Sequence, residues 1–183
     1  MTTANKITMV RIAMIPFFVW FAMQGDPVSD AIALALFCIA SFTDFLDGYI
    51  ARKYNQVTDF GKFVDPLADK LLVTSALICF VGLGMIPAVV AIIILSREFL
   101  VTSIRLVAAP KGRVIPADKW GKSKTICQMV WISSLLLIQW ALSMGIQGSW
   151  MVLLNQVLMS LTTVLTVFSG GNYLIKNIDL LKG

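Results

Sequence analysis

Six stretches of the chain are long and apolar enough to cross a lipid bilayer, and they constrain the fold more than any other feature. They cover residues 7–23, 31–53, 61–83, 86–109, 125–144 and 150–176. A membrane-spanning helix needs about 20 mostly apolar residues. Since 58% of the 183 residues are hydrophobic and 14% are charged, little sequence is left for a water-soluble domain. We therefore predict an all-α polytopic membrane protein, a single domain of six transmembrane helices over residues 1–183, with room for a short interfacial helix at its N-terminus.

The basic residues gather on one side of this predicted membrane domain. The loops at 24–30, 82–87 and 145–149 contain no Lys or Arg, so all 15 lie at the other side or in the helix ends that adjoin it. The positive-inside rule then places both termini in the cytoplasm. The net charge of +5 indicates orientation and a basic face toward anionic lipid or phosphate, and it does not suggest nucleic-acid binding.

Four aspartates lie inside or beside these apolar stretches, where an unpaired charge is costly. Asp44 and Asp47 are three positions apart and Asp65 and Asp69 are four apart, so each pair shares one face of its helix. Both pairs fall at the cytoplasmic ends of neighbouring antiparallel helices, which a short connection joins. We expect the four carboxylates to face one another just below the membrane surface.

Four carboxylates this close together cannot all ionise without a cation. Oxygen ligands suit Mg²⁺ or Mn²⁺, and the absence of histidine excludes a His-ligated zinc site. Two such ions could hold a diphosphate during phosphoryl transfer. The small residues Gly48, Ala51 and Gly61 leave room for a ligand, and Arg52 is placed to bind a phosphate with two hydrogen bonds.

The aspartates belong to the longer pattern D-x2-D-G-x2-A-R-x8-G-x3-D-x3-D, which runs from Asp44 to Asp69. At every fixed position and spacing it resembles the CDP-alcohol phosphotransferase family. The resemblance implies transfer of a phosphatidyl or similar group from a CDP-linked donor to an alcohol, with release of CMP. It also implies that the four aspartates hold two divalent metal ions and that Asp69 is the catalytic base. The residues that it assigns to the CDP pocket are Gly48, Ala51, Arg52 and Gly61.

Three shorter stretches resemble the bacterial phosphatidylglycerophosphate synthases, a branch of the same family. This second resemblance implies CDP-diacylglycerol as donor, glycerol 3-phosphate as acceptor, the cytoplasmic membrane of a bacterium as location, and a homodimer. It adds Asn5 and Thr8 to the CDP pocket. The stretches are Asn5-Lys6-Ile7-Thr8 followed by Arg11, Ser96-Arg97-Glu98-Phe99 followed by Arg105, and Gly121-Lys122-x-Lys124-Thr125-x-x-Gln128.

The phosphate of such an acceptor needs basic groups near the metal ions. Arg105 is one candidate, because it can lean toward the same helix face as Arg97 eight positions earlier, about 80° away. Glu98 is expected to balance the charge of the neighbouring Arg97. The predicted acceptor-phosphate residues are, in order of preference, Arg105, Lys122 and Lys124, then Arg113 and Lys119.

Other interpretations of the same residues stay open. The reaction could use another alcohol, namely serine, inositol phosphate or phosphatidylglycerol. An intramembrane prenyltransferase also uses aspartate-rich motifs, although its aspartate spacing differs and six spans are few for that class. A divalent-cation transporter would explain carboxylates in apolar sequence, and it predicts metal flux without release of CMP.

Overall fold

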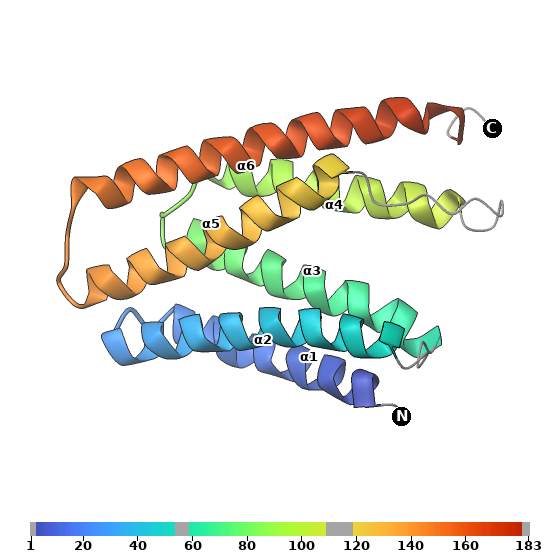
Figure 1. The fold of residues 1–183 in the computed structure, drawn as a ribbon. Helices are drawn as coiled ribbons and strands as arrows, with labels where there is room; N and C mark the ends of the chain where they lie inside the picture. Colours follow the sequence, from blue (N-terminus) through green and yellow to red (C-terminus); the bar gives the residue numbers. More distant parts are fainter. Residues whose placement is uncertain (1–2, 54–58, 109–118, 181–183) are drawn as a thin grey trace. The chain divides into compact units, whose positions relative to one another are not determined.

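The computed structural model describes residues 3–53, 59–108 and 119–180; within these ranges, the side chains of 3–6, 45–53, 59–63, 65, 66, 69 and 180 are not described. Over the described ranges all regular structure is helical, which confirms the predicted all-α fold (Figure 1). The helices are α1 (Thr3–Ala22), α2 (Pro27–Lys53), α3 (Asp59–Gly82), α4 (Ala88–Ala108), α5 (Lys119–Ser143), α6 (Ser149–Lys176) and the short 3-10 helix η2 (Ile178–Leu180).

The helix bounds follow the predicted stretches, with two differences. Residues 3–22 form one continuous helix, so no separate interfacial helix precedes the first span in the described part of the chain. Helix α5 begins at Lys119 instead of residue 125, so Lys122 and Lys124 lie well inside it.

By length and composition, three of the described helices could cross a membrane: α2 over Pro27–Asp44, α5 and α6. Helices α1 and α3 have shorter apolar stretches, Ile7–Ala22 and Lys70–Gly82. Helix α4 is interrupted by Arg97, Glu98 and Arg105. Charged residues of the predicted site thus interrupt the apolar sequence of α3 and α4.

The chain divides into two compact units, and the first comprises Met1–Leu83 and Ile132–Gln147. In this unit α1, α2 and α3 pack against one another (Figure 1). Phe18 of α1 and Phe37 of α2 are fully buried, and their ring centroids are 5.9 Å apart. Phe80 of α3 and Leu135 of α5 are also fully buried, so all four helix segments contribute to the core.

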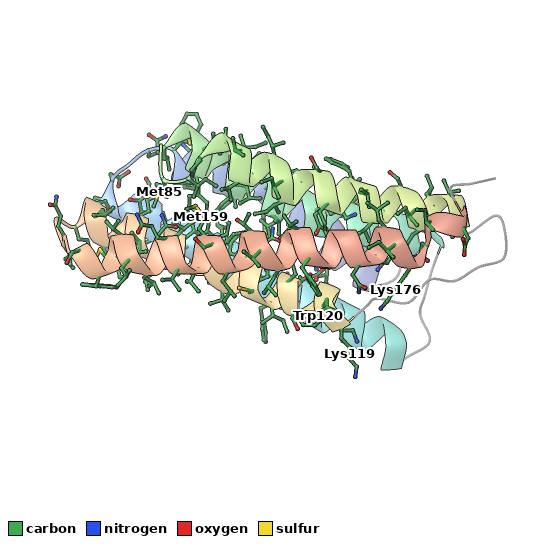
Figure 2. The ribbon with its side chains drawn as sticks, turned by 90° about the horizontal axis from the view of Figure 1, so that it is seen from above. Met85, Lys119, Trp120, Met159 and Lys176 are labelled. Atoms are coloured by element: carbon green, nitrogen blue, oxygen red, sulfur yellow. The ribbon has the colours of Figure 1, made fainter. Side chains whose placement is uncertain are left out.

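The second unit comprises Gly84–Trp131 and Gly148–Gly183, and in it α4 packs against α6. The side chains of Val101, Ile104 and Tyr173 form one buried cluster. The buried Trp131 donates from Nε1 to Asn155 Oδ1 at 3.0 Å, which joins α5 to α6. Figure 2 shows Lys119, Trp120 and Lys176 toward one end of this unit, and Met85 and Met159 toward the other. The labelled basic residues thus share one end of the unit.

The start of α2 shows how the sequence sets a helix boundary. Asp26 precedes Pro27, and its Oδ1 accepts hydrogen bonds from the backbone N–H groups of Val28 and Ser29, both at 3.1 Å. A carboxylate before a first-turn proline is a favourable helix start, because it satisfies N–H groups that have no partner within the helix. The hydrogen bonds from Ser29, first from its side chain and then from its backbone, lower the pKa of Asp26.

A buried polar contact ties three helix ends together at the same end of the first unit. Gln139 Nε2, on α5, donates to the carbonyl oxygen of Ala22 at 2.7 Å and to Asp30 Oδ1 at 2.6 Å. Asp30 is 1% exposed, and its Oδ2 has no hydrogen-bond partner among the described residues. One amide nitrogen therefore links the ends of α1 and α5 to the start of α2.

Replacing Gln139 by leucine should lower the unfolding temperature of the purified protein, because Ala22 and Asp30 lose the donor that they share. Leaving a buried acceptor unsatisfied costs about 1–3 kcal/mol. Thermal unfolding in detergent measures the effect. The matched control is Gln156→Leu, which changes an exposed glutamine of α6. Equal stability losses in the two variants would show that the contact at Gln139 does not stabilise the fold.

Candidate active site

The buried face of α1 changes from apolar to polar along its length. Ile15, Phe18 and Ala22 are buried, and the same face continues toward the N-terminus into Thr8 and Arg11, each 1% exposed. A buried arginine requires partners, because removing its charge from water is costly. The N-terminal end of this face is therefore a polar region inside the first unit.

The partner of Arg11 is the first aspartate of the sequence pattern. Its Nη1 donates to Asp44 Oδ1 at 2.5 Å across the contact between α1 and α2. The Asp44 side chain is 40% exposed, whereas the Arg11 side chain is 1% exposed. The pair thus has a buried cationic end and an accessible carboxylate end.

The remaining positions of the pattern lie in helical register with buried residues of α2 and α3. In the register of α2, residues 47, 48 and 51 follow Ala33, Phe37 and Ala40, which are buried. In α3, residues 61, 65 and 69 precede Leu72 and Ala76, which are also buried. The side chains of Asn5, Asp47, Gly48, Ala51, Arg52, Gly61, Asp65 and Asp69 lie outside the described residues.

A second polar cluster lies in the second unit, where Glu98 of α4 pairs with two cations. Its Oε1 accepts from Arg97 Nη1 at 3.0 Å and from Lys124 Nζ at 2.6 Å. Arg97 Nη2 donates to Ser169 Oγ on α6 at 2.7 Å. The expectation that Glu98 balances the charge of Arg97 is confirmed, and Lys124, 1% exposed, shares the same carboxylate oxygen.

The other predicted acceptor-phosphate residues of this unit are exposed. Arg105 Nε donates to Tyr173 Oη at 3.3 Å, and its guanidinium carbon lies 5.9 Å from the centre of the tyrosine ring. Lys119 and Lys122 are exposed in the first turns of α5. Lys122 is exposed and Lys124 is buried because residues two positions apart lie about 200° apart around a helix, on nearly opposite faces. Arg113 lies outside the described residues.

The model of one protein family matches most of the chain. It is described as CDP-alcohol phosphatidyltransferase, and it covers residues 1–168. The chain belongs to this family. The match includes the whole aspartate pattern and both polar clusters, apart from one residue, Ser169, just beyond its end.

Curated proteins that are similar to this chain carry names that state a reaction. A CDP-diacylglycerol–glycerol-3-phosphate 3-phosphatidyltransferase of Bacillus subtilis (strain 168) is 51% identical over 145 residues, which are 73% of this chain and 75% of the relative. One of the same name from Rickettsia bellii (strain RML369-C) is 37% identical over 172 residues, covering 92% and 91%. A probable phosphatidylglycerophosphate synthase of Mycobacterium tuberculosis (strain CDC 1551 / Oshkosh) is 44% identical over 137 residues, covering 73% and 65%.

Membership of the family implies a divalent metal ion, and the donor chemistry of the pattern fits one. Carboxylate oxygens are the ligands that Mg²⁺ and Mn²⁺ prefer, and the accessible carboxylate of Asp44 can be reached from outside the helix contact. Among the side chains that are described, no three acidic, Cys or His residues lie together as a metal site. Three of the four aspartates of the pattern are outside that set.

Sequence reasoning missed the partners that hold these charged residues. It noted Arg11 within a motif without pairing it with Asp44, and it did not connect Lys124 or Ser169 to the Arg97–Glu98 pair. A signal was present, because an arginine in the middle of an apolar helix needs an acidic partner on a neighbouring helix. The sequence alone does not say which acid supplies it.

Arg11 and Asp44 should prove energetically coupled. Arg11→Met should lower the unfolding temperature, and adding Asp44→Asn should cost less than it does in the wild type, because no charge is then left without its partner. For residues in contact such coupling is about 0.5–3 kcal/mol. The cycle is measured by thermal unfolding in chelator, so that bound metal does not contribute.

A matched cycle combines Asp44→Asn with Arg97→Met, since the terminal nitrogens of Arg97 donate to Glu98 and Ser169. These two losses should add. If the Arg11 cycle were equally additive, the ion pair would contribute nothing to stability.

Proposed function

We propose that this protein transfers the phosphatidyl group of CDP-diacylglycerol to sn-glycerol 3-phosphate, which yields phosphatidylglycerophosphate and CMP. The single observation that carries the proposal is the aspartate pattern at the polar ends of packed helix faces, in a chain of this family. The names of the relatives from Bacillus subtilis and Rickettsia bellii supply the donor and the acceptor.

The proposal extends to the setting of the enzyme. The chain acts as one transmembrane domain over residues 1–183, in the cytoplasmic membrane of a bacterium, with its active site toward the cytoplasm. The position of all Lys and Arg on one side of the predicted membrane domain supports this orientation. The acyl chains of the donor stay in the lipid, while its head group meets the soluble acceptor at the surface. A homodimer belongs to the same proposal.

In this proposal the two aspartate pairs bind two divalent ions, Mg²⁺ or Mn²⁺. When bound, the ions would neutralise charge on the diphosphate of the donor and hold its reacting phosphorus. The proposed ligands are Asp44, Asp47, Asp65 and Asp69. Arg11 supports them by holding the Asp44 carboxylate through Oδ1.

The rest of the pattern would bind the nucleotide end of the donor. Small residues in the first turns of α3 and the last turns of α2 let the diphosphate approach the backbone, and Arg52 contacts its oxygens through two parallel hydrogen bonds. Thr8, buried one turn from Arg11, contributes from α1. The proposed CDP-binding residues are Asn5, Thr8, Gly48, Ala51, Arg52 and Gly61.

The chemical step is a direct displacement. Asp69 accepts the proton of the C1 hydroxyl of glycerol 3-phosphate, and that oxygen forms a bond to the phosphorus that carries the diacylglycerol. The bond between this phosphorus and the oxygen bridging to the CMP phosphate breaks, and CMP leaves with the electron pair. Holding the reacting groups in alignment also lowers the activation barrier, so a weakly basic carboxylate can serve as the base.

The phosphate of the acceptor would be bound by exposed basic residues of the second unit. Arg105 is held at its Nε by Tyr173, which leaves the other guanidinium nitrogens able to donate. Lys119 and Lys122 project from the first turns of α5, and Arg113 belongs to the preceding loop in the sequence. Lys124 is 1% exposed and shares Glu98 with Arg97, so this group of three residues keeps one net positive charge that would act on the phosphate from a distance.

The test is release of CMP by the purified protein supplied with CDP-diacylglycerol and one alcohol at a time. We expect glycerol 3-phosphate to support release, and we expect a chelator to abolish it because the carboxylates lose their cations. Serine, inositol phosphate and phosphatidylglycerol are the comparison acceptors. Release with one of these alone would move the assignment to another branch of the family. Metal flux into vesicles without any CMP release would favour a transporter.

Asp69→Asn should lower kcat by about 10²–10⁴-fold, which is the usual contribution of a general base. Binding of the CDP donor should change little, because the amide keeps an oxygen that can still face a metal ion. Donor binding and turnover are measured on the same preparation. Asp179→Asn, an exposed aspartate near the C-terminus, is the matched control. Undiminished turnover in Asp69→Asn would remove this residue as the base.

A further inference from the structure

The side chain of Arg97 lies against two helical glycines on different helices. A Cβ atom added to Gly170 of α6 would be 3.0 Å from Arg97 Cγ, and one added to Gly121 of α5 would be 3.1 Å from Arg97 Nη2. Both distances are tighter than ordinary van der Waals contact. Gly171, the next residue of α6, would meet nothing within 4 Å. Gly170 and Gly121 thus leave space for the stem and the guanidinium of one arginine.

The same arginine is fixed at its charged end. Its side chain is 11% exposed, and its two terminal nitrogens donate to Glu98 and to Ser169. Its Nε has no hydrogen-bond partner among the described residues, so the two terminal contacts hold the group. A glycine inside a helix is less favourable than alanine by about 1 kcal/mol. Two helical glycines beside one buried arginine therefore indicate that α5 and α6 must approach this side chain closely.

The network also fixes the beginning of α5. Gly121 contacts Arg97, and Lys124 pairs with Glu98, so two positions in the first turns of the helix are held from α4. Trp120 packs edge-on against Phe168 of α6, with ring centroids 4.9 Å apart. Lys122 lies between these fixed positions. The rotation of this helix segment about its axis, and with it the direction of Lys122, therefore depends on Arg97.

We propose that Arg97 is a positioning residue, which sets the start of α5 through Gly121, Gly170, Glu98 and Lys124 so that Lys122 and Lys119 face the phosphate of the acceptor. The inference rests on the proposed function for its substrate, glycerol 3-phosphate. It adds three residues, Arg97, Gly121 and Gly170, that do not touch the substrate and that affect the acceptor step alone.

The test compares Gly170→Ala with Gly171→Ala in the full-length protein in lipid nanodiscs. Gly170→Ala should raise the KM for glycerol 3-phosphate about tenfold, because a methyl group there displaces the stem of Arg97. The KM for CDP-diacylglycerol and kcat should change less than about twofold, within the spread of neutral surface changes. Gly171→Ala should leave all three near their wild-type values.

A second pair of variants separates the two glycine contacts. Arg97→Lys removes Nη2 but keeps Cγ, so Gly121→Ala should add no further rise in KM for the acceptor in that background. Gly170→Ala should keep its full effect there, because a lysine stem still occupies the space. If Gly121→Ala raised the KM as much in Arg97→Lys as in the wild type, the glycine would not act through the guanidinium.

Hydrogen exchange of peptides covering residues 119–126 provides a readout that does not need turnover. Exchange should accelerate in Gly170→Ala and stay at the wild-type rate in Gly171→Ala. Equal exchange and equal acceptor KM in the two variants would overturn the positioning role.

Arg105→Ala tests the underlying function on its own. It removes a group proposed to contact the phosphate, so it should raise the acceptor KM while leaving exchange at 119–126 unchanged. If the wild-type protein did not use glycerol 3-phosphate, the proposed function would fail. The exchange comparison would then show whether Arg97 orders α5, and the acceptor role assigned to that order would be withdrawn.

Discussion

An ionised side chain at the end of an apolar helix face needs an opposite charge beside it, and both units of this protein are organised around that requirement. In the first unit Arg11 is buried and pairs with the more accessible Asp44. In the second, Glu98 is shared by Arg97 and the buried Lys124. In each case the buried partner is a cation and the less buried partner is a carboxylate. The Arg11–Asp44 pair joins α1 to α2, and the Glu98–Lys124 pair joins α4 to α5.

The charge balance of the proposed site follows from the same requirement. Arg11 neutralises one of the four aspartates, so the pattern alone would still leave a net negative region within apolar sequence. Two divalent ions overcompensate that charge, and the surplus matches a diphosphate once Arg52 is counted with it. The proposed site would therefore be electrically balanced only with metal and donor together, which would make activity depend on the metal. In the proposal, the phosphate of the acceptor is bound by separate cations in the second unit.

Sequence reasoning predicted the helices well, because they depend on local signals. The metal chemistry assigned to the aspartate pattern stays a prediction. Apolar stretches of about 20 residues mark spans wherever they occur, and the spacing of Asp44 and Asp47 fixes their common face whatever the tertiary structure. The start of α5 was placed too late, since Lys122 and Lys124 read as loop charge. Lys124 can lie within the helix because Glu98 neutralises it, and that contact joins residues 26 positions apart.

The partners within each polar cluster were harder to predict for a related reason. Which acid pairs with Arg11, or which hydroxyl accepts from Arg97, depends on the register between helices, and no local pattern encodes it. The roles of Gly121 and Gly170 were equally hidden, because a helical glycine has a steric role only when its neighbour is known. The relatives, in turn, name the reaction without saying how these residues support it.

The most direct test of the account is the number of Mn²⁺ ions that the protein binds, measured by electron paramagnetic resonance in nanodiscs containing CDP-diacylglycerol. We expect two ions per chain in the wild type and fewer when Asp47 or Asp65 is replaced by asparagine. A wild-type protein that binds no Mn²⁺ while it releases CMP, or asparagine variants that still bind two, would contradict the idea that these carboxylates converge on metal.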